Sequence, residues 1–210
     1  MDKIYEEFTT TISHIRQTSD VYKYLKDVQK IETVSLDDIL RSQIVTLVSA
    51  LDRYLHEKVR KGVCDMFLCN KSATSRFKNF SLTSETVLRV WGDASLTLVQ
   101  REMMINEAVA QKLKMASFQH VNKIKDALSF IWEEKHKMSL IAKEMMVPGA
   151  NDNDKEKYLT QKLELLVGRR DQIAHESDMS YTGKREITQM EVEDAITFID
   201  SFVACVDRYV

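Results

Sequence analysis

Apolar residues recur along most of the chain at spacings of three and four, which is the period of an amphipathic helix. The longest apolar stripe comprises Leu40, Ile44, Leu47, Val48, Leu51, Leu55 and Val59. It ends before Gly62, a residue type that often terminates helices, and Ser35 with Asp38 imitates a capping box at its start. The stripe therefore predicts a central core helix over residues 35–61.

Similar stripes predict helices over much of the remaining chain. They cover residues 3–30 (as one helix, or as two with a break near residues 18–20), 83–91, 95–115, 117–146, 155–175 and 188–209. The last helix has the clearest start, because Thr188 and Glu191 form a capping box between the apolar residues Ile187 and Val192.

Two stretches lack the helical period and predict loops: residues 61–84, and residues 147–154 with the only proline, Pro148. Glycine is scarce, with 5 in 210 residues, and β-branched residues do not alternate with polar ones over any long run. The sequence therefore predicts an all-α fold, a helical bundle without a sheet.

Composition narrows the functional classes. Lys and Arg number 30 against 32 Asp and Glu, so the chain lacks the basic excess typical of nucleic-acid-binding proteins, and any phosphate binding must be local. Cys64, Cys69 and Cys205 form no C-x-x-C pair, which argues against a disulfide framework or a zinc site. No apolar signal segment opens the chain, and no run of 18 uncharged apolar residues occurs. We expect a cytoplasmic protein without a membrane segment.

The candidate chemistry lies in a polar run, residues 168–176, with the sequence GRRDQIAHE. Arg170 supplies a fixed cation, Asp171 an acceptor, and His175 a group that exchanges a proton near neutral pH. On an unbroken helix Asp171 and His175 share a face, whereas Arg170 and His175 diverge by about 140°. One site that uses both requires a turn between them or a second copy of the motif facing the first.

A second polar group lies beside the apolar stripe of the central helix. Ser49, Asp52 and His56 are spaced by three and four residues, so they stack on one helix face. Either the three side chains reach a shared polar site, or Asp52 and His56 form a local pair at the edge of the core.

The run Arg170-Asp171-Gln172-Ile173-Ala174-His175 resembles the signature of HEPN domains: arginine, a polar residue, three residues, then histidine. Residues 47–57, LVSALDRYLHE, resemble the early helix of bacterial RiboL-PSP-HEPN members. The resemblance implies one helical HEPN-like domain over residues 1–210, with residues 62–116 as an inserted or elaborated region. The tyrosine that some members carry two residues after the histidine is absent, because Ser177 occupies that position.

The resemblance also implies a function: a metal-independent endoribonuclease without a cofactor, acting as a homodimer in which two motifs meet. His175 would deprotonate the ribose 2′-OH or protonate the leaving 5′-oxygen, Arg170 would hold the phosphate, and Asp171 would fix the histidine tautomer or the motif backbone. The groups that could support these three residues are Arg169, Glu176, Asp52 and His56. The partners would be RNA, a second copy, and an antitoxin or defence-system protein, since many family members are toxins or antiphage effectors.

Two other functions remain open from the sequence. One is a non-catalytic HEPN module that binds a nucleotide or a partner protein through the same cleft, and the other is a purely structural helical adaptor. For the motif itself, the alternative is that Arg170 and Asp171 form a helix-end ion pair while His175 caps the carbonyls of that helix end.

Overall fold

The computed structural model describes residues 2–31, 36–114, 116–181 and 183–210. Its elements are α1 (Lys3–Lys23), a π-helical turn (Tyr24–Val28), α2 (Asp37–Phe67), a 3-10 turn (Phe77–Asn79), α3 (Ser84–Gly92), α4 (Leu98–Leu113), α5 (Val121–Ile131), α6 (Lys137–Glu144), α7 (Asp152–Glu176), β1 (Met179–Ser180), β2 (Gly183–Lys184) and α8 (Gln189–Tyr209). The predicted all-α class is confirmed. The expectation of no sheet is wrong in one detail, because β1 and β2 form a two-residue antiparallel pair.

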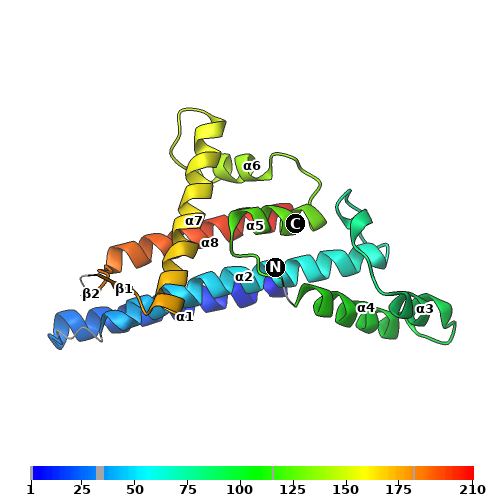
Figure 1. Cartoon of the computed structure of the whole chain (residues 1–210), viewed down its shortest axis with the longest axis horizontal. Helices are drawn as coiled ribbons and strands as arrows, with labels where there is room; N and C mark the ends of the chain where they lie inside the picture. The colour runs from blue at the N-terminus through cyan, green and yellow to red at the C-terminus, as the bar shows by residue number, and fades with distance from the viewer. Residues whose placement is uncertain (1, 32–35, 115, 182) are drawn as a thin grey trace.

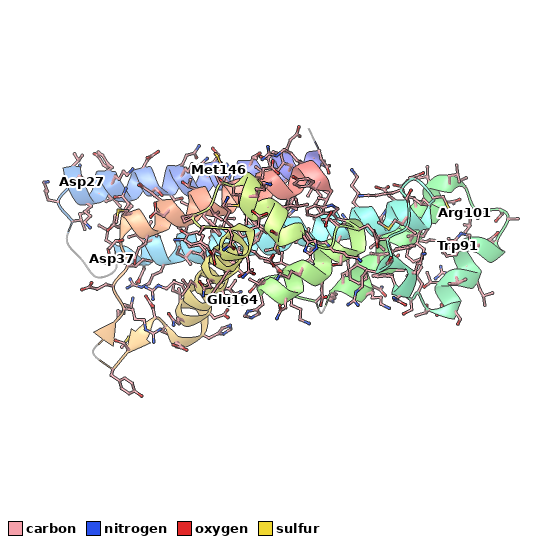
Figure 2. The ribbon with its side chains drawn as sticks, turned by 90° about the horizontal axis from the view of Figure 1, so that it is seen from above. Asp27, Asp37, Trp91, Arg101, Met146 and Glu164 are labelled. Carbon is pink, nitrogen blue, oxygen red and sulfur yellow. The ribbon has the colours of Figure 1, made fainter. Side chains whose placement is uncertain are left out.

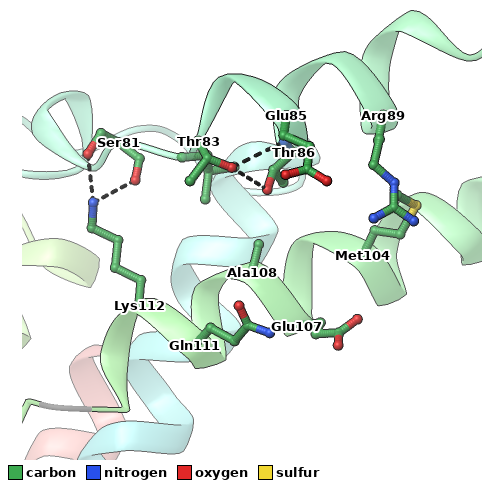
Figure 3. A pocket seen from close by; sticks show the side chains of 11 residues that line it. Ser81, Thr83, Glu85, Thr86, Arg89, Met104, Glu107, Ala108, Gln111 and Lys112 are labelled. Atoms are coloured by element: carbon green, nitrogen blue, oxygen red, sulfur yellow. Dashed lines mark hydrogen bonds between the residues drawn. The ribbon is translucent and has the colours of Figure 1, made fainter.

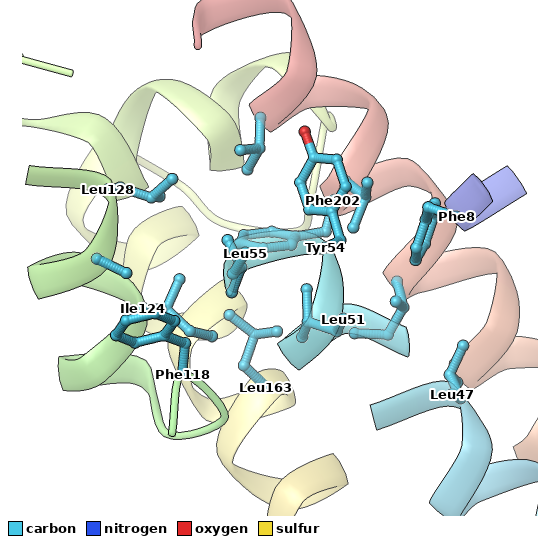
Figure 4. Packing of buried hydrophobic residues seen from close by; sticks show 14 of the residues in the cluster. Phe8, Leu47, Leu51, Tyr54, Leu55, Phe118, Ile124, Leu128, Leu163 and Phe202 are labelled. Atoms are coloured by element: carbon cyan, nitrogen blue, oxygen red, sulfur yellow. The ribbon is translucent and has the colours of Figure 1, made fainter. Parts of the chain in front are cut away.

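The central helix is α2, which runs along the length of the molecule with α1 and α8 beside it and α7 crossing it (Figure 1). Its apolar stripe is buried as predicted. Figure 4 shows Leu51, Tyr54 and Leu55 of α2 facing side chains from four other segments. These partners are Phe8 of α1, Phe118 and Ile124 at α5, Leu163 of α7 and Phe202 of α8.

The end of α2 differs from the prediction. Gly62 does not stop the helix, which continues to Phe67. A Cβ atom at Gly62 would lie 2.4 Å from Cγ2 of Ile131, so this glycine allows α5 to pack closely against α2. The predicted start at Ser35 lies outside the described residues.

The predicted helix over residues 117–146 is wrong as a single element. It is divided into α5 and α6, because the chain turns to an extended conformation at Trp132. The Trp132 ring stacks on the Tyr209 ring of α8, with 4.6 Å between centroids and 10° between planes. This tertiary contact ends α5 where the apolar period alone would continue it.

The first helix is continuous through residues 18–20 and passes directly into the π-helical turn, so the alternative of one helix is correct. Phe8, Ile12 and Ile15 bury its inner face against the core. The N-terminal helix is therefore a full member of the bundle.

The Thr188–Glu191 capping box that starts α8 is present as predicted.

At one end of α2, α3 and α4 form an antiparallel arm, in which α4 packs on α2 and α3 packs mainly on α4 (Figures 1 and 2). The motif-bearing end of α7 and the β1–β2 hairpin lie toward the other end of α2 (Figure 1).

Candidate functional site

The polar run of residues 168–176 is the C-terminal part of α7. Asn151 caps the start of this helix, and Leu159, Leu163 and Val167 bury its inner face. The helix continues without a break to Glu176. No turn therefore separates Arg170 from His175, and their directions diverge by about 140°.

Arg170 and Asp171 pair with each other: Nη1 of Arg170 donates to Oδ1 of Asp171 at 2.9 Å. The Arg170 side chain is 21% exposed, and its buried Nε has no hydrogen-bond partner among the described residues. Of the two roles expected for Asp171, a contact that orients His175 is not observed in the part of the chain that the structure describes. This ion pair is the one predicted if the motif only stabilises the end of the helix.

His175 is exposed in the last turn of α7, and within the described ranges no side chain or backbone group bonds to its ring. It does not cap the helix, because the Ser177 amide donates to the Gln172 carbonyl, as does the Asp178 amide at 3.0 Å. The capping of the helix end by His175, which that alternative also predicts, is therefore not observed. The imidazole is left accessible to an external group.

The turn after the motif is built around a buried carboxylate. Ser177 and Asp178 both adopt left-handed backbone conformations, with φ of 53° and 57°. Asp178 is fully buried, and its Oδ2 accepts a 2.6 Å hydrogen bond from Nε of Arg41. Arg169 binds the same carboxylate through Nη1 and Nη2. Such a pairing of one buried anion with two guanidinium groups requires good geometry to offset the cost of desolvation.

Arg169 thus binds Asp178 and, at 3.0 Å, the carbonyl of Glu186, rather than facing Arg170 and His175. The sequence reasoning missed Arg41 and Asp178. A signal existed for Arg41, since it precedes Ile44 by three residues and Val48 by seven and so lies on the buried face of α2. A cation at a buried position needs an acid nearby, but its position along the chain could not be known.

The β1–β2 hairpin follows this turn and is tied to α2 and α7. The Arg185 amide donates to the Asp178 carbonyl at 2.9 Å, and Nζ of Lys184 contacts Oδ1 of Asp38 at 2.7 Å. Glu176 is exposed and pairs with Arg185 at 3.6 Å.

The pKa of Asp38 is lowered, first by the Lys184 hydrogen bond and further by the Arg41 charge, although partial burial opposes the shift. A lowered carboxyl pKa means that the Asp38 contact stabilises the fold above the ordinary Asp range and is lost as the pH falls through the lowered value. This contact between the hairpin and α2 is therefore present at neutral pH and is lost in acid.

Asp52 and His56 form a local pair, with 3.9 Å between Nε2 and Oδ1, as one of the two interpretations predicts. Oδ1 of Asp52 accepts from the Phe118 amide at 2.6 Å, and the His56 ring lies on the Phe118 ring at 4.4 Å. From Arg41 to Asp52 the helix advances by about 16 Å. The two residues hold the segment before α5 and do not join the motif of the same chain, so a supporting role for them at the motif stays a prediction.

A surface groove with a volume of about 630 Å³ lies elsewhere, between α3 and α4 (Figure 3). Thr83, Arg89, Glu107 and Lys112 are among its lining residues, and none belongs to residues 168–176. Within the described ranges, no three His, Cys, Asp or Glu side chains form a group that could hold a metal ion. No described helix has the length and apolar character needed to cross a membrane.

Comparison with known protein families supports the resemblance that the motif suggested. The family model of RiboL-PSP-HEPN matches residues 6–210, which is nearly the whole chain. No curated protein and no solved structure matches the chain. A match of this extent includes most of α1, the α3–α4 arm and the motif-bearing helix. The chain therefore belongs to the RiboL-PSP-HEPN family.

Proposed function

We propose that the protein is a metal-independent endoribonuclease that cleaves RNA by attack of the ribose 2′-oxygen on the adjacent phosphate. The proposal rests chiefly on one observation: a chain of this family keeps the arginine and histidine of the motif, and its His175 is exposed and unbonded among the described residues. HEPN domains generally serve as RNase modules, which favours this activity over a structural role.

The chemistry needs few groups, because the nucleophile is already positioned beside the phosphorus within the RNA. An imidazole such as His175 takes the proton of the 2′-OH, or returns a proton to the 5′-oxygen as the P–O5′ bond breaks. Arg170 offsets the negative charge that accumulates on the phosphoryl oxygens. To do so, it exchanges its Asp171 partner for the phosphate. The products are a 2′,3′-cyclic phosphate and a 5′-hydroxyl.

The divergence of Arg170 and His175 supports a site shared between two copies of the chain. His175 lies on the same helix face as Gly168, seven residues earlier, where the structure leaves open space. Leu165, one turn away, is 70% exposed. Glycine inside a helix is destabilising by about 0.5–1 kcal/mol relative to alanine. The stability of the monomer therefore does not explain why this open face carries a glycine. A second α7 packed on it would supply the missing half of the site.

The activity is tested with the purified chain and a labelled RNA oligonucleotide in excess EDTA. We expect cleavage to persist and to leave 2′,3′-cyclic phosphate ends, since neither the acid–base step nor the arginine requires a metal. A matched oligonucleotide with one 2′-deoxyribose should resist cleavage at that position only. Intact RNA after prolonged incubation would remove the nuclease proposal, and cleavage at the deoxyribose would remove the 2′-OH mechanism.

The shared site predicts a dimer that Leu165→Lys disrupts, because the substitution places a charge in a face that would be desolvated. Light scattering should give twice the monomer mass for the unaltered chain and the monomer mass for the variant. Leu88→Lys is a matched control: Leu88 is also 70% exposed, but it lies on α3 in the distant arm. Equal masses for the two variants would count against α7 as the interface.

As a cellular role we propose a toxin or antiphage effector that acts in the cytoplasm and is held in check by an antitoxin or defence-system partner. Residues 62–116, which contain the α3–α4 arm, would be an inserted or elaborated part of one domain over residues 1–210.

A non-catalytic HEPN module, which binds a nucleotide or a partner protein, is the second candidate function. The Arg170–Asp171 pair favours it, since the motif of one chain is not assembled for catalysis.

A further inference from the structure

A fully exposed tyrosine follows the motif closely in the chain. Tyr181 follows β1, and none of the described residues forms a hydrogen bond, ring contact or ion pair with it. It lies six positions after His175, so the two Cα atoms are no more than about 20 Å apart. One short oligonucleotide can therefore contact both.

The exposure of Tyr181 is not that of a loose loop. Asp178, three residues earlier, is fully buried and held by Arg41 and Arg169, and its carbonyl accepts the Arg185 amide at 2.9 Å. Left-handed conformations at two successive non-glycine residues, Ser177 and Asp178, cost free energy and persist only where the surroundings hold them. The network thus presents an aromatic ring to solvent from an anchored support at the end of α7.

We infer that Tyr181 is a nucleobase-stacking residue of the RNA site, placed next to the phosphate that the motif binds. This rests on the proposed RNA substrate and names how the substrate is held. Single-stranded RNA is recognised largely by stacking of splayed bases on aromatic side chains, and this affinity does not depend on net charge. It suits a chain whose net charge is -2 and which cannot hold RNA by a general basic surface.

The charges around the hairpin agree with this placement. Lys184 follows Tyr181 by three positions, is exposed, and pairs with the half-exposed Asp38. Exposed ion pairs contribute little stability, so Lys184 can transfer to a phosphate group of a bound strand with little loss. Stacking by Tyr181 and a contact from Lys184 would then fix the strand against α7.

Binding is measured with the His175→Ala chain, so that RNA stays intact, by anisotropy of a labelled single-stranded RNA. Adding Tyr181→Ala should weaken binding at least tenfold, whereas Tyr181→Phe and Tyr181→Trp should keep it within about threefold, because stacking needs only the ring. Trp91→Ala, which removes an exposed aromatic from the distant α3, is the control. An abasic scan of the RNA should find one position where the loss of the base and the loss of Tyr181 are not additive.

The outcomes separate this inference from the nuclease proposal. If the unaltered chain cuts RNA and Tyr181→Ala binds as tightly as its parent, stacking is refuted while the nuclease stands. If the chain does not cut RNA but binds it in a Tyr181-dependent way, stacking stands and the nuclease falls. Absence of RNA binding by the His175→Ala chain overturns the inference, as does a Tyr181→Ala chain that loses its dimer by light scattering.

Discussion

Replacing His175 with alanine should lower RNA cleavage by about 100- to 10,000-fold, the range that positioned acid–base groups contribute. The imidazole is exposed and bonds to none of the described residues, so helicity and the unfolding midpoint should not change. Cleavage rates and circular dichroism measure the two effects. His14→Ala, which removes another exposed histidine from α1, should retain full activity. Undiminished cleavage by the His175→Ala chain would exclude the imidazole as acid or base.

A mixing experiment tests whether Arg170 of one chain works with His175 of another. Arg170→Ala and His175→Ala chains should each be inactive, but exchange between them creates mixed dimers with one intact site. Random exchange should restore about a quarter of the original activity, because half the dimers are mixed and each has one of two sites. If mixing restores nothing although mixed dimers form, the two groups do not come from opposite chains.

Replacing Asp178 with asparagine should destabilise the chain by about 3–5 kcal/mol, the cost of removing one partner from a buried ion pair. The substitution keeps the shape of the side chain but leaves the guanidinium groups of Arg41 and Arg169 with no anion between them. Urea unfolding followed by circular dichroism measures the change.

Asp38→Asn is the control for this substitution. Asp38 is half exposed and its pair with Lys184 lies at the surface, so its loss should cost less than about 1 kcal/mol. If the two variants were equally stable, the turn after the motif would not depend on its buried carboxylate. Tyr181 would then lack the anchored support from which we argued its role.

Most helices were predictable because their boundaries depend on local chemistry. The Thr188–Glu191 capping box and the apolar stripe of α8 act through neighbours within one or two turns, so the sequence displays them directly. The motif was visible for the same reason, since its residues are contiguous. The errors arose where a distant residue intervenes. Gly62 lies where α5 packs closely on α2 through Ile131, and Trp132, where α5 ends, stacks on Tyr209 of α8.

By itself the sequence determined the all-α class, the amphipathic faces and the arginine and histidine of the motif, because periodicity and side-chain chemistry are local properties. It also determined that Arg170 and His175 would diverge if the helix were continuous. The tertiary structure decided that the helix is continuous, that Asp171 binds Arg170, and that Arg169 belongs to the buried Asp178. These pairings depend on which charges meet across α2, α7 and the hairpin. Residues that are far apart in the sequence form these contacts, so the local pattern along the chain does not show them.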